Sequence, residues 1–336
     1  MAQIDGFFKL MNDEGASDLH VVAEQQPLLR IRGDMERVKF KKLGNDELRA
    51  MLYEICPEEK IKVFEETGDI DFGYEIPGLA RYRCNYFRQK YGVGAVFREI
   101  PSDILSCEQL GLPKVINRLA HLPKGLVLVT GPTGSGKSTT LAAIVDEANK
   151  TRKDHILTIE DPIEFVHKSQ KCIINHREVG THTKSFSSAL RGALREDPDI
   201  IMVGEMRDLE TISLAMEAAM TGHLVFGTLH TINAMKTVDR IIEIFPANQQ
   251  GQVRSTLSDA LKAVVSQTLF KRVDVKGRCA ALEILIATPA VRNLIRDSKT
   301  FQIISTMQTG KKYGMQTLDD AIMILLEKRM ISPDDA

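Results

Sequence analysis

The stretch GLVLVTGPTGSGKS, residues 125–138, decides the fold of this chain. Its first six residues are apolar or β-branched, as is typical of a buried strand in a parallel sheet. A turn with three glycines follows, and a helix is expected from Lys137. Residues 131–138 match the pattern G-x-x-x-x-G-K-[ST] at every fixed position, in the strand–turn–helix context that this pattern requires. The sequence therefore predicts a phosphate-binding loop.

The residue types of this loop suit a triphosphate and its metal ion. Glycines allow successive backbone N–H groups to curl around a polyphosphate without a side-chain clash. The positive end of the following helix faces the anion, the Lys137 ammonium reaches the β- and γ-phosphates, and the Ser138 hydroxyl is a ligand for Mg²⁺. ATP and Mg²⁺ are therefore the predicted cofactors. The predicted nucleotide contacts are Thr133, Gly134, Ser135, Gly136, Lys137, Ser138 and Thr139.

Strands and helices alternate along the chain after the loop. Further short apolar strands are predicted at 155–160, 199–203 and 224–229, separated by helices at 185–195, 209–220 and 234–244. Such alternation is typical of an α/β fold with a mostly parallel sheet and helices on both of its faces. Two later strands, 267–273 and 279–287, are expected to extend this sheet as a hairpin that turns at Lys276–Gly277.

The part of the chain before the loop has a different pattern. It mixes short strands and helices without a strand–helix–strand nucleotide motif, which indicates a separate, smaller α+β module. Gly111 and Pro113 interrupt the pattern between the two parts. We expect an N-terminal domain over 1–110, a linker over 111–122 and an ATPase domain over 123–336.

The overall composition narrows the class of protein. Hydrophobic residues make up 43% of the chain, and the formal net charge is −1, as in an ordinary soluble globular protein. Lys and Arg dominate no segment, so we expect no nucleic-acid partner. The N-terminus lacks the features of a secretory signal, and the apolar stretches are too short to span a bilayer. We therefore expect a cytoplasmic protein, with its five scattered cysteines as small buried side chains.

Residues 199–205, DIIMVGE, read as an apolar strand that ends in a carboxylate. In open α/β sheets, the C-terminal ends of the strands form the edge where ligands bind. A carboxylate there can approach Mg²⁺ directly or through water, so Glu205 is predicted to bind the metal ion beside Ser138. The alternative is a surface acid that caps the following helix.

Three carboxylates, Glu160, Asp161 and Glu164, occur at the end of the predicted strand 155–160. ATP hydrolysis needs a group that orients and polarises the attacking water. Each of the three can serve, and each taken alone can also be a solvated acid. Their spacing does not choose between them.

Two histidines, His223 and His230, flank the predicted strand 224–229. His230 follows the C-terminal end of the strand, where a sensor of the γ-phosphate can sit. The alternative is one core histidine with satisfied hydrogen bonds and one loop histidine.

Arg81 and Arg83 belong to a predicted strand and project to one face, because side chains alternate along a strand. An ATPase site needs extra positive charge as the γ-phosphoryl group leaves, and arginine can supply it. Arg88 and Arg98 lie nearby in the sequence. The alternative is a charged strand edge that faces solvent.

Together these motifs resemble the secretion and pilus ATPase family. They correspond in order to a Walker A motif at 131–138, an Asp box at 158–167, a Walker B motif at 199–205 and a His box at 221–230. The resemblance covers essentially the whole chain. It implies a ring hexamer with an N-terminal PAS-like domain and a C-terminal RecA-like P-loop ATPase domain. Residues 290–296, AVRNLIR, are similar to the AIRNLIR motif of the pilus-retraction members.

The resemblance also implies residue roles and partners. Glu164 is the catalytic carboxylate of the Asp box, and Glu205 is the Walker B acid. Arg81 and Arg83 complete the site of a neighbouring subunit. The implied function is ATP-driven retraction of type IV pili at the inner-membrane pilus base, with a platform protein and a paralogous retraction ATPase as candidate partners and membrane contact only through proteins. The alternatives are an ATPase of pilus extension or type II secretion, and a nucleotide-regulated scaffold that does not hydrolyse ATP.

Overall fold

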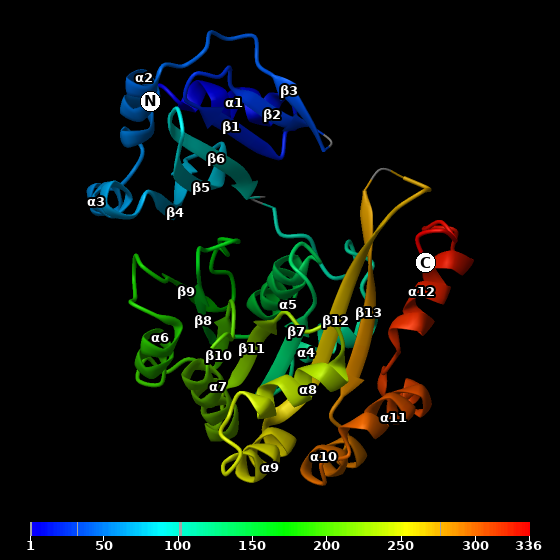
Figure 1. Ribbon diagram of the computed structural model, residues 1–336. Helices are drawn as coiled ribbons and strands as arrows, with labels where there is room; N and C mark the ends of the chain where they lie inside the picture. The colour runs from blue at the N-terminus through cyan, green and yellow to red at the C-terminus, as the bar shows by residue number, and fades with distance from the viewer. Residues whose placement is uncertain (1, 32, 101–102, 276) are drawn as a thin grey trace. The chain divides into compact units, whose positions relative to one another are not determined.

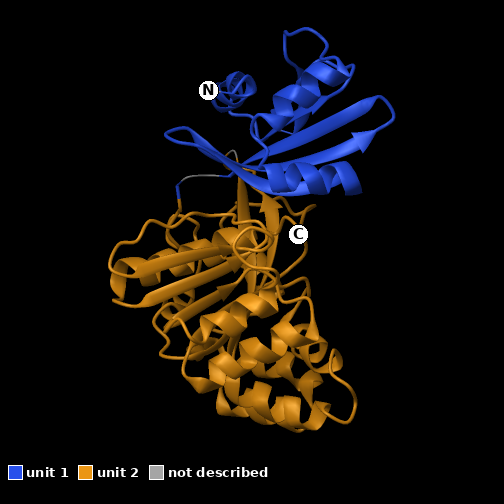
Figure 2. Ribbon diagram, turned by 90° about the vertical axis from the view of Figure 1, so that its left-hand side faces the viewer, with its two compact units in different colours: residues 1–103 blue, residues 104–336 orange. Residues whose placement is uncertain are grey.

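The computed structural model describes residues 2–31, 33–100, 103–275 and 277–336. The chain divides into two compact units, residues 1–103 and residues 104–336, which are coloured separately in Figure 2. Within the described residues, no helix is both long enough and apolar enough to cross a bilayer.

The segment 111–122, expected to be a linker, lies inside the second unit. It contains helix α4 (Lys114–Leu119), which buries Ile116 and Leu119 against the sheet of that unit. These two side chains are three residues apart on one face of the helix, so packing them removes apolar surface from water. The glycine and proline at 111–113 therefore precede a packed helix.

The first unit is a six-stranded antiparallel sheet in the order β3-β2-β1-β6-β5-β4, with three helices packed on one face (Figure 1). Its strands are β1 (Asp18–Val22), β2 (Leu28–Ile31), β3 (Asp34–Arg37), β4 (Asp69–Ile76), β5 (Ala80–Gln89) and β6 (Gly92–Ile100). Its helices are α1 (Asp5–Asp13), α2 (Asn45–Tyr53) and α3 (Glu58–Thr67).

An aromatic core holds the first unit together. Phe8 of α1 stacks on Tyr82 of β5 with ring centroids 4.2 Å apart, and it meets Phe97 of β6 edge-on at 5.0 Å. Burial alternates along β5, so Tyr82 points into the core while Arg81 and Arg83 project from the opposite face. The prediction that these two arginines share a face is confirmed.

The second unit is a seven-stranded sheet in the order β13-β12-β7-β11-β10-β8-β9, in which only β13 runs antiparallel to its neighbour. Its strands are β7 (Gly125–Thr130), β8 (His155–Glu160), β9 (Ile173–Glu178), β10 (Ile200–Val203), β11 (Leu224–Leu229), β12 (Leu261–Lys271) and β13 (Arg278–Ile286). Its helices are α4, α5 (Lys137–Thr151), α6 (Phe186–Ala193), α7 (Leu209–Thr221), α8 (Ala234–Glu243), α9 (Gln250–Ala260), α10 (Pro289–Arg296), η1 (Thr300–Gln302), α11 (Ile303–Thr309), η2 (Lys311–Tyr313) and α12 (Leu318–Glu327).

Helices cover both faces of this sheet, as Figure 1 shows. In the buried strand β7, Leu126 and Leu128 point to the face covered by α6 to α11, whereas Val127 and Val129 point to the face covered by α4 and α5. Alternate side chains thus fill two separate cores. The predicted α/β fold, with a mostly parallel sheet between layers of helices, is confirmed.

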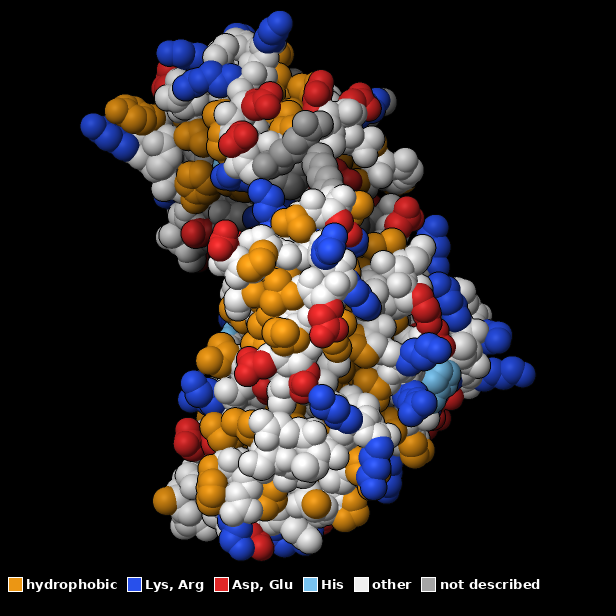
Figure 3. All heavy atoms as spheres, turned by 90° about the vertical axis from the view of Figure 1, so that its right-hand side faces the viewer, with side chains coloured by type: hydrophobic (Ala, Val, Ile, Leu, Met, Phe, Trp, Pro, Cys, Tyr) orange, Lys and Arg blue, Asp and Glu red, His pale blue; other side chains and the backbone are white. Residues whose placement is uncertain are grey.

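The C-terminal hairpin differs in extent from the prediction. β12 begins at Leu261, earlier than the expected strand 267–273, because it pairs with β7 along its buried length. The expected turn includes Lys276, which lies outside the described residues. Helix α12 packs on β13 and leaves Met323 exposed, and Figure 3 shows hydrophobic side chains between charged ones on the face that α12 occupies.

Candidate nucleotide and catalytic site

The site begins at the turn between β7 and α5. Gly131 and Gly136 adopt φ angles of 142° and 85°, which favour glycine. A Cβ atom on Gly131 would lie 2.4 Å from the backbone oxygen of Gln267, so a larger residue does not fit without moving that strand. Because α5 begins at Lys137, the first residues of the helix, Lys137 and Ser138, stand at the end of the turn. This is the strand–turn–helix geometry that the sequence predicts.

Lys137 bonds to the loop and interacts electrostatically with two carboxylates. Its ammonium donates hydrogen bonds to the backbone oxygens of Gly131, at 2.9 Å, and Pro132, at 3.0 Å. Partial burial lowers the pKa of Lys137, and the negative charges of Glu205 and Glu164 act in the opposite direction. The lysine and both acids therefore belong to one electrostatic site.

Gln267 of β12 fixes the loop to the sheet. Its Nε2 donates to the backbone oxygen of Ser135 at 2.6 Å, and its Oε1 accepts from the Thr140 hydroxyl at 2.7 Å. All three residues are buried. Sequence reasoning missed Gln267, because its two partners are more than a hundred residues away along the chain and the local strand pattern does not reveal them.

Glu205 follows the fully buried strand β10 and receives two hydrogen bonds. Its Oε1 lies 2.6 Å from Arg207 Nε and 2.7 Å from His230 Nε2. Burial alone would raise the pKa of Glu205, but the hydrogen bond and charge of Arg207, together with His230, lower it below its ordinary value. The carboxylate is therefore ionised at neutral pH, and it is linked directly to the predicted γ-phosphate sensor His230.

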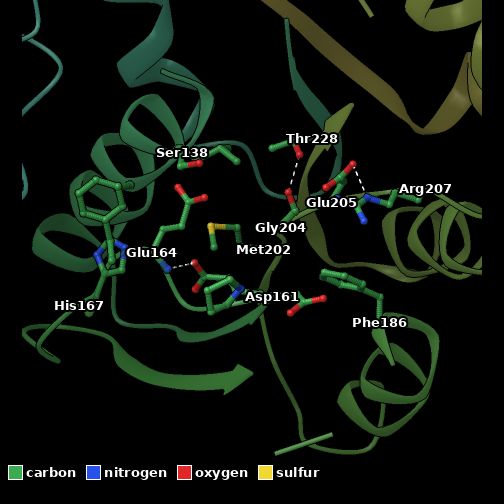
Figure 4. Close-up of a pocket in the computed structure, with 15 residues that line it drawn as sticks. Ser138, Asp161, Glu164, His167, Phe186, Met202, Gly204, Glu205, Arg207 and Thr228 are labelled. Carbon is green, nitrogen blue, oxygen red and sulfur yellow. Dashed lines mark hydrogen bonds and ion pairs between the residues drawn. The ribbon is translucent and has the colours of Figure 1, made fainter. Parts of the chain in front are cut away.

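The three acids at and after the end of β8 differ in their environment. Glu160 is 5% exposed, and its Oε2 accepts the backbone N–H of Glu164 at 3.0 Å. Asp161 points toward Phe186 in Figure 4, whereas the Glu164 carboxylate points toward the Ser138 side of the pocket. Glu160 thus supports the backbone of the loop, and Glu164 presents its carboxylate to the space beside the phosphate-binding loop.

One pocket of the second unit brings these groups together, as Figure 4 shows. Predicted site residues that line it are Ser138, Glu164 and Glu205. Residues that the sequence did not single out, Arg207 and Thr228, line the same pocket. The Thr228 hydroxyl donates to the backbone oxygen of Gly204 and so ties the end of β11 to the turn that carries Glu205.

The two histidines around β11 have different environments. His223 Nδ1 donates to the backbone oxygen of Ala218 at 2.9 Å, so this histidine closes the C-terminal end of α7. His230 is half exposed and contacts Glu205. Only His230 therefore belongs to the site.

Arg81 and Arg83 lie in the first unit, on β5. Arg81 is 3.7 Å from the carboxylate of Glu75, and Arg83 is 3.5 Å from that of Asp71. Both pairs join neighbouring positions on β4 and β5, and both are partly open to solvent. Within the first unit these arginines are parts of cross-strand ion pairs.

A protein-family model described as type II/IV secretion system protein matches residues 4–294. A type IV pilus retraction ATPase named PilT, from Pseudomonas aeruginosa, is 56% identical over 96% of this chain and 94% of its own length. A twitching motility protein from Neisseria gonorrhoeae is 53% identical over 92% of this chain and 83% of its own length.

A solved structure is also similar to this chain. A crystal structure of the pilus retraction motor PilT with bound ADP has a TM-score of 0.92 to this structure. It is 46% identical in sequence, and the match covers 100% of this chain and 96% of the other. The likeness therefore extends through both units.

Proposed function

The chain belongs to the type II/IV secretion system protein family, and on that premise we propose that it is an ATP-hydrolysing motor that drives retraction of type IV pili. The observation that carries the proposal is the pocket beside the phosphate-binding loop. It joins a hydroxyl at the start of α5, Ser138, with two carboxylates from separate strand ends, Glu164 and Glu205. The relatives named as retraction and twitching proteins cover nearly the whole chain, which supports the same assignment.

The donor set at the pocket suits a hard divalent cation. The Ser138 hydroxyl and the Glu205 carboxylate both supply oxygen, and the lowered pKa of Glu205 keeps it ionised. These two residues would hold Mg²⁺, directly or through water. When bound, the ion neutralises charge on the phosphate oxygens.

Residues of the phosphate-binding loop and α5 bind the phosphates of ATP. Backbone N–H groups of the loop and the N-terminal end of α5 bind the phosphates. The Lys137 ammonium, now bonded to two loop carbonyl oxygens, turns to the β- and γ-phosphates. Thr133 and Thr139, on either side of Lys137 in the sequence, complete the nucleotide contacts that we propose.

Glu164 orients the attacking water for in-line displacement at the γ-phosphorus. The water oxygen bonds to phosphorus, the bond to the bridging oxygen breaks, and ADP and phosphate leave. His230, through its hydrogen bond to Glu205, reports whether the γ-phosphate is present. Arg81 and Arg83 of a neighbouring subunit stabilise the departing charge.

In a ring of six subunits, this cycle of ATP binding and hydrolysis produces mechanical work. Loss of the γ-phosphate releases the closed arrangement of each subunit, as in other phosphate-controlled switches. The ring acts in the cytoplasm on an inner-membrane platform protein at the pilus base, with a paralogous retraction ATPase as a further partner. It reaches the membrane only through these proteins.

Three matched variants test this proposal: Glu164→Gln, Glu160→Gln and Glu205→Gln. Glu164→Gln is expected to lower kcat for ATP hydrolysis by about 100- to 10,000-fold, because it removes the group that polarises water. Glu205→Gln is expected to raise the Mg²⁺ concentration needed for activity. Glu160→Gln keeps an acceptor for the Glu164 N–H and is expected to retain most of the rate.

Bacterial strains that carry each of the three variants are then scored for pilus retraction. Non-retracting, excess pili in the Glu164→Gln strain are expected. Loss of pili instead would indicate an extension motor, and unchanged ATP hydrolysis in Glu164→Gln would reject the assigned chemistry.

A further inference from the structure

The segment that carries Glu164 is held by side chains of the two strands beside it. Residues 161–167 form neither helix nor strand. Three of its backbone N–H groups nevertheless donate to side chains: Ile163 to Glu178 Oε2 at 3.1 Å, Glu164 to Glu160 Oε2 at 3.0 Å, and His167 to His176 Nε2 at 3.2 Å. The acceptors belong to β8 and β9.

These acceptors are fixed by their own burial and pairing. Glu160 and Glu178 are each 5% exposed. Glu178 uses its second carboxylate oxygen, Oε1, to accept the Thr181 hydroxyl at 3.0 Å. Because bonds from N–H groups to buried carboxylates are charge-assisted, they hold the backbone more firmly than bonds to water.

His176 is oriented by a bond on its other nitrogen. Its Nε2 lies 3.2 Å from the backbone nitrogen of His167 and 3.3 Å from the His167 oxygen, and its Nδ1 lies 2.8 Å from the Thr158 hydroxyl. In the tautomer whose Nε2 accepts the His167 N–H, Nδ1 carries the proton and donates to Thr158. The His167 ring stacks on the His176 ring, with centroids 5.9 Å apart and planes 13° from parallel. The imidazole therefore cannot turn without breaking both bonds and the stack.

The register of the sheet places the acceptors together. Thr158 pairs with His176, and Glu160 pairs with Glu178, across the parallel ladder of β8 and β9. Residues two apart on a strand share a face, so all four side chains project on the side of the segment 161–167. Neither His176 nor Glu178 lines the nucleotide pocket.

We propose that His176 and Glu178 of β9 are positioning residues, which fix the segment 161–167 so that the Glu164 carboxylate faces the phosphates. This inference rests on the catalytic role proposed for Glu164. A displacement of about 1 Å in such a group is enough to lower the rate by about 100-fold, so the two anchors set the rate of hydrolysis through Glu164 without touching ATP.

A matched pair at position 176 tests the anchor. His176→Gln places an amide oxygen near the position of Nε2 and can still accept from His167. His176→Asn places its amide near Nδ1 and keeps only the bond to Thr158. We expect Asn to lower kcat by about 10- to 100-fold, with the KM for ATP changed by less than about threefold, and Gln to restore most of the rate.

A second pair at position 178 makes the same test on the other anchor. Glu178→Gln keeps an acceptor for the Ile163 N–H, whereas Glu178→Met has similar volume and no oxygen. We expect only Met to reduce kcat strongly. Denaturant midpoints and the affinity for a fluorescent ATP analogue identify any variant that fails to fold. If Glu178→Met fails to fold, the pair at position 176 carries the test.

The outcomes separate this inference from the proposed function. If His176→Asn and Glu178→Met hydrolyse ATP at the wild-type rate while Glu164→Gln does not, the anchors have no positioning role. If Glu164→Gln is fully active, the role of Glu164 itself is wrong. In the double variant Glu164→Gln/His176→Asn, we expect no further loss beyond Glu164→Gln, since both changes act on one step. A multiplicative loss would show that His176 acts elsewhere and would overturn the proposal.

Discussion

Two loops meet in the nucleotide pocket, and they are held in different ways. The phosphate-binding loop depends on backbone geometry: Gly131 and Gly136 occupy left-handed conformations against the neighbouring strand. The segment 161–167 depends on side-chain acceptors from two strands. A loop specified by glycines therefore leaves a readable pattern in the sequence, whereas a loop held by side-chain acceptors on neighbouring strands does not.

Among changes that test how the two loops are held, the largest effect is expected at Gly131. In Gly131→Ala, the new methyl group meets the backbone oxygen of Gln267, and the φ of 142° is strained for alanine. We expect ATP hydrolysis to fall by about 100-fold or more, because the loop must move away from β12. The measurement is steady-state phosphate release.

Gly251→Ala is the matched control for this change. Gly251 lies in α9, and a Cβ atom there meets nothing within 4 Å. This variant should keep full activity and gain up to about 1 kcal/mol in unfolding free energy. Equal activity of both variants would contradict the account of the phosphate-binding loop.

Acid should destabilise the protein through His167, the last residue of the segment 161–167. Burial, and then the charge of His176, lowers the pKa of His167 to about 4. Above about pH 6.5 the group is neutral in both the folded and the unfolded states, so its titration does not change stability. As the pH falls from 6.5 toward 4, the unfolded chain binds a proton that the folded chain does not, and the unfolding free energy falls by up to about 3 kcal/mol.

Denaturant unfolding at a series of pH values measures this loss. His167→Gln should flatten the curve between pH 6.5 and 4. His121→Gln, at a histidine that is about half exposed, should leave the acid-induced loss in place. A curve that His167→Gln does not change would show that the loss has another source.

The smallest effect is expected at Gln267, which holds the loop without contacting phosphate. Gln267→Leu leaves the Thr140 hydroxyl and the Ser135 carbonyl without a partner, so we expect a loss of about 2 kcal/mol in unfolding free energy and a higher KM for ATP. Adding Thr140→Val should recover part of the stability, because an apolar pair replaces an unpaired hydroxyl. Denaturant midpoints measure this loss. An unaltered midpoint in Gln267→Leu would argue against the role of Gln267 in holding the loop.

Much of the fold could be predicted from the sequence. The strands β7, β8, β10 and β11 are short, apolar and followed by chemically distinct residues, so their positions and their parallel direction were predictable, whereas their order in the sheet was not. The family resemblance is confirmed by the match over residues 4–294. The clustering of Ser138, Glu164 and Glu205 follows from the shared edge of parallel strands.

Other features were not predictable for physical reasons. β9 has the sequence IINHRE, whose polar second half hides the apolar pattern of a strand. In β3 all four residues are exposed, so its sequence shows no alternation. The support that Gln267 gives to the phosphate-binding loop depends on contacts between distant segments, which no local pattern encodes.

The edge position of β9 has a consequence for evolution. Because β9 pairs on one side only within this sheet, substitutions at its exposed positions, such as Ile173, disturb little of the core, whereas those at Glu178 change a buried contact. From the positioning role that we propose for His176 and Glu178, we expect natural variants at these two positions to change the rate of ATP hydrolysis and to leave the affinity for ATP unchanged. Related ATPases with different rates of hydrolysis would then differ in the edge strand β9 and share the same residues around the phosphates.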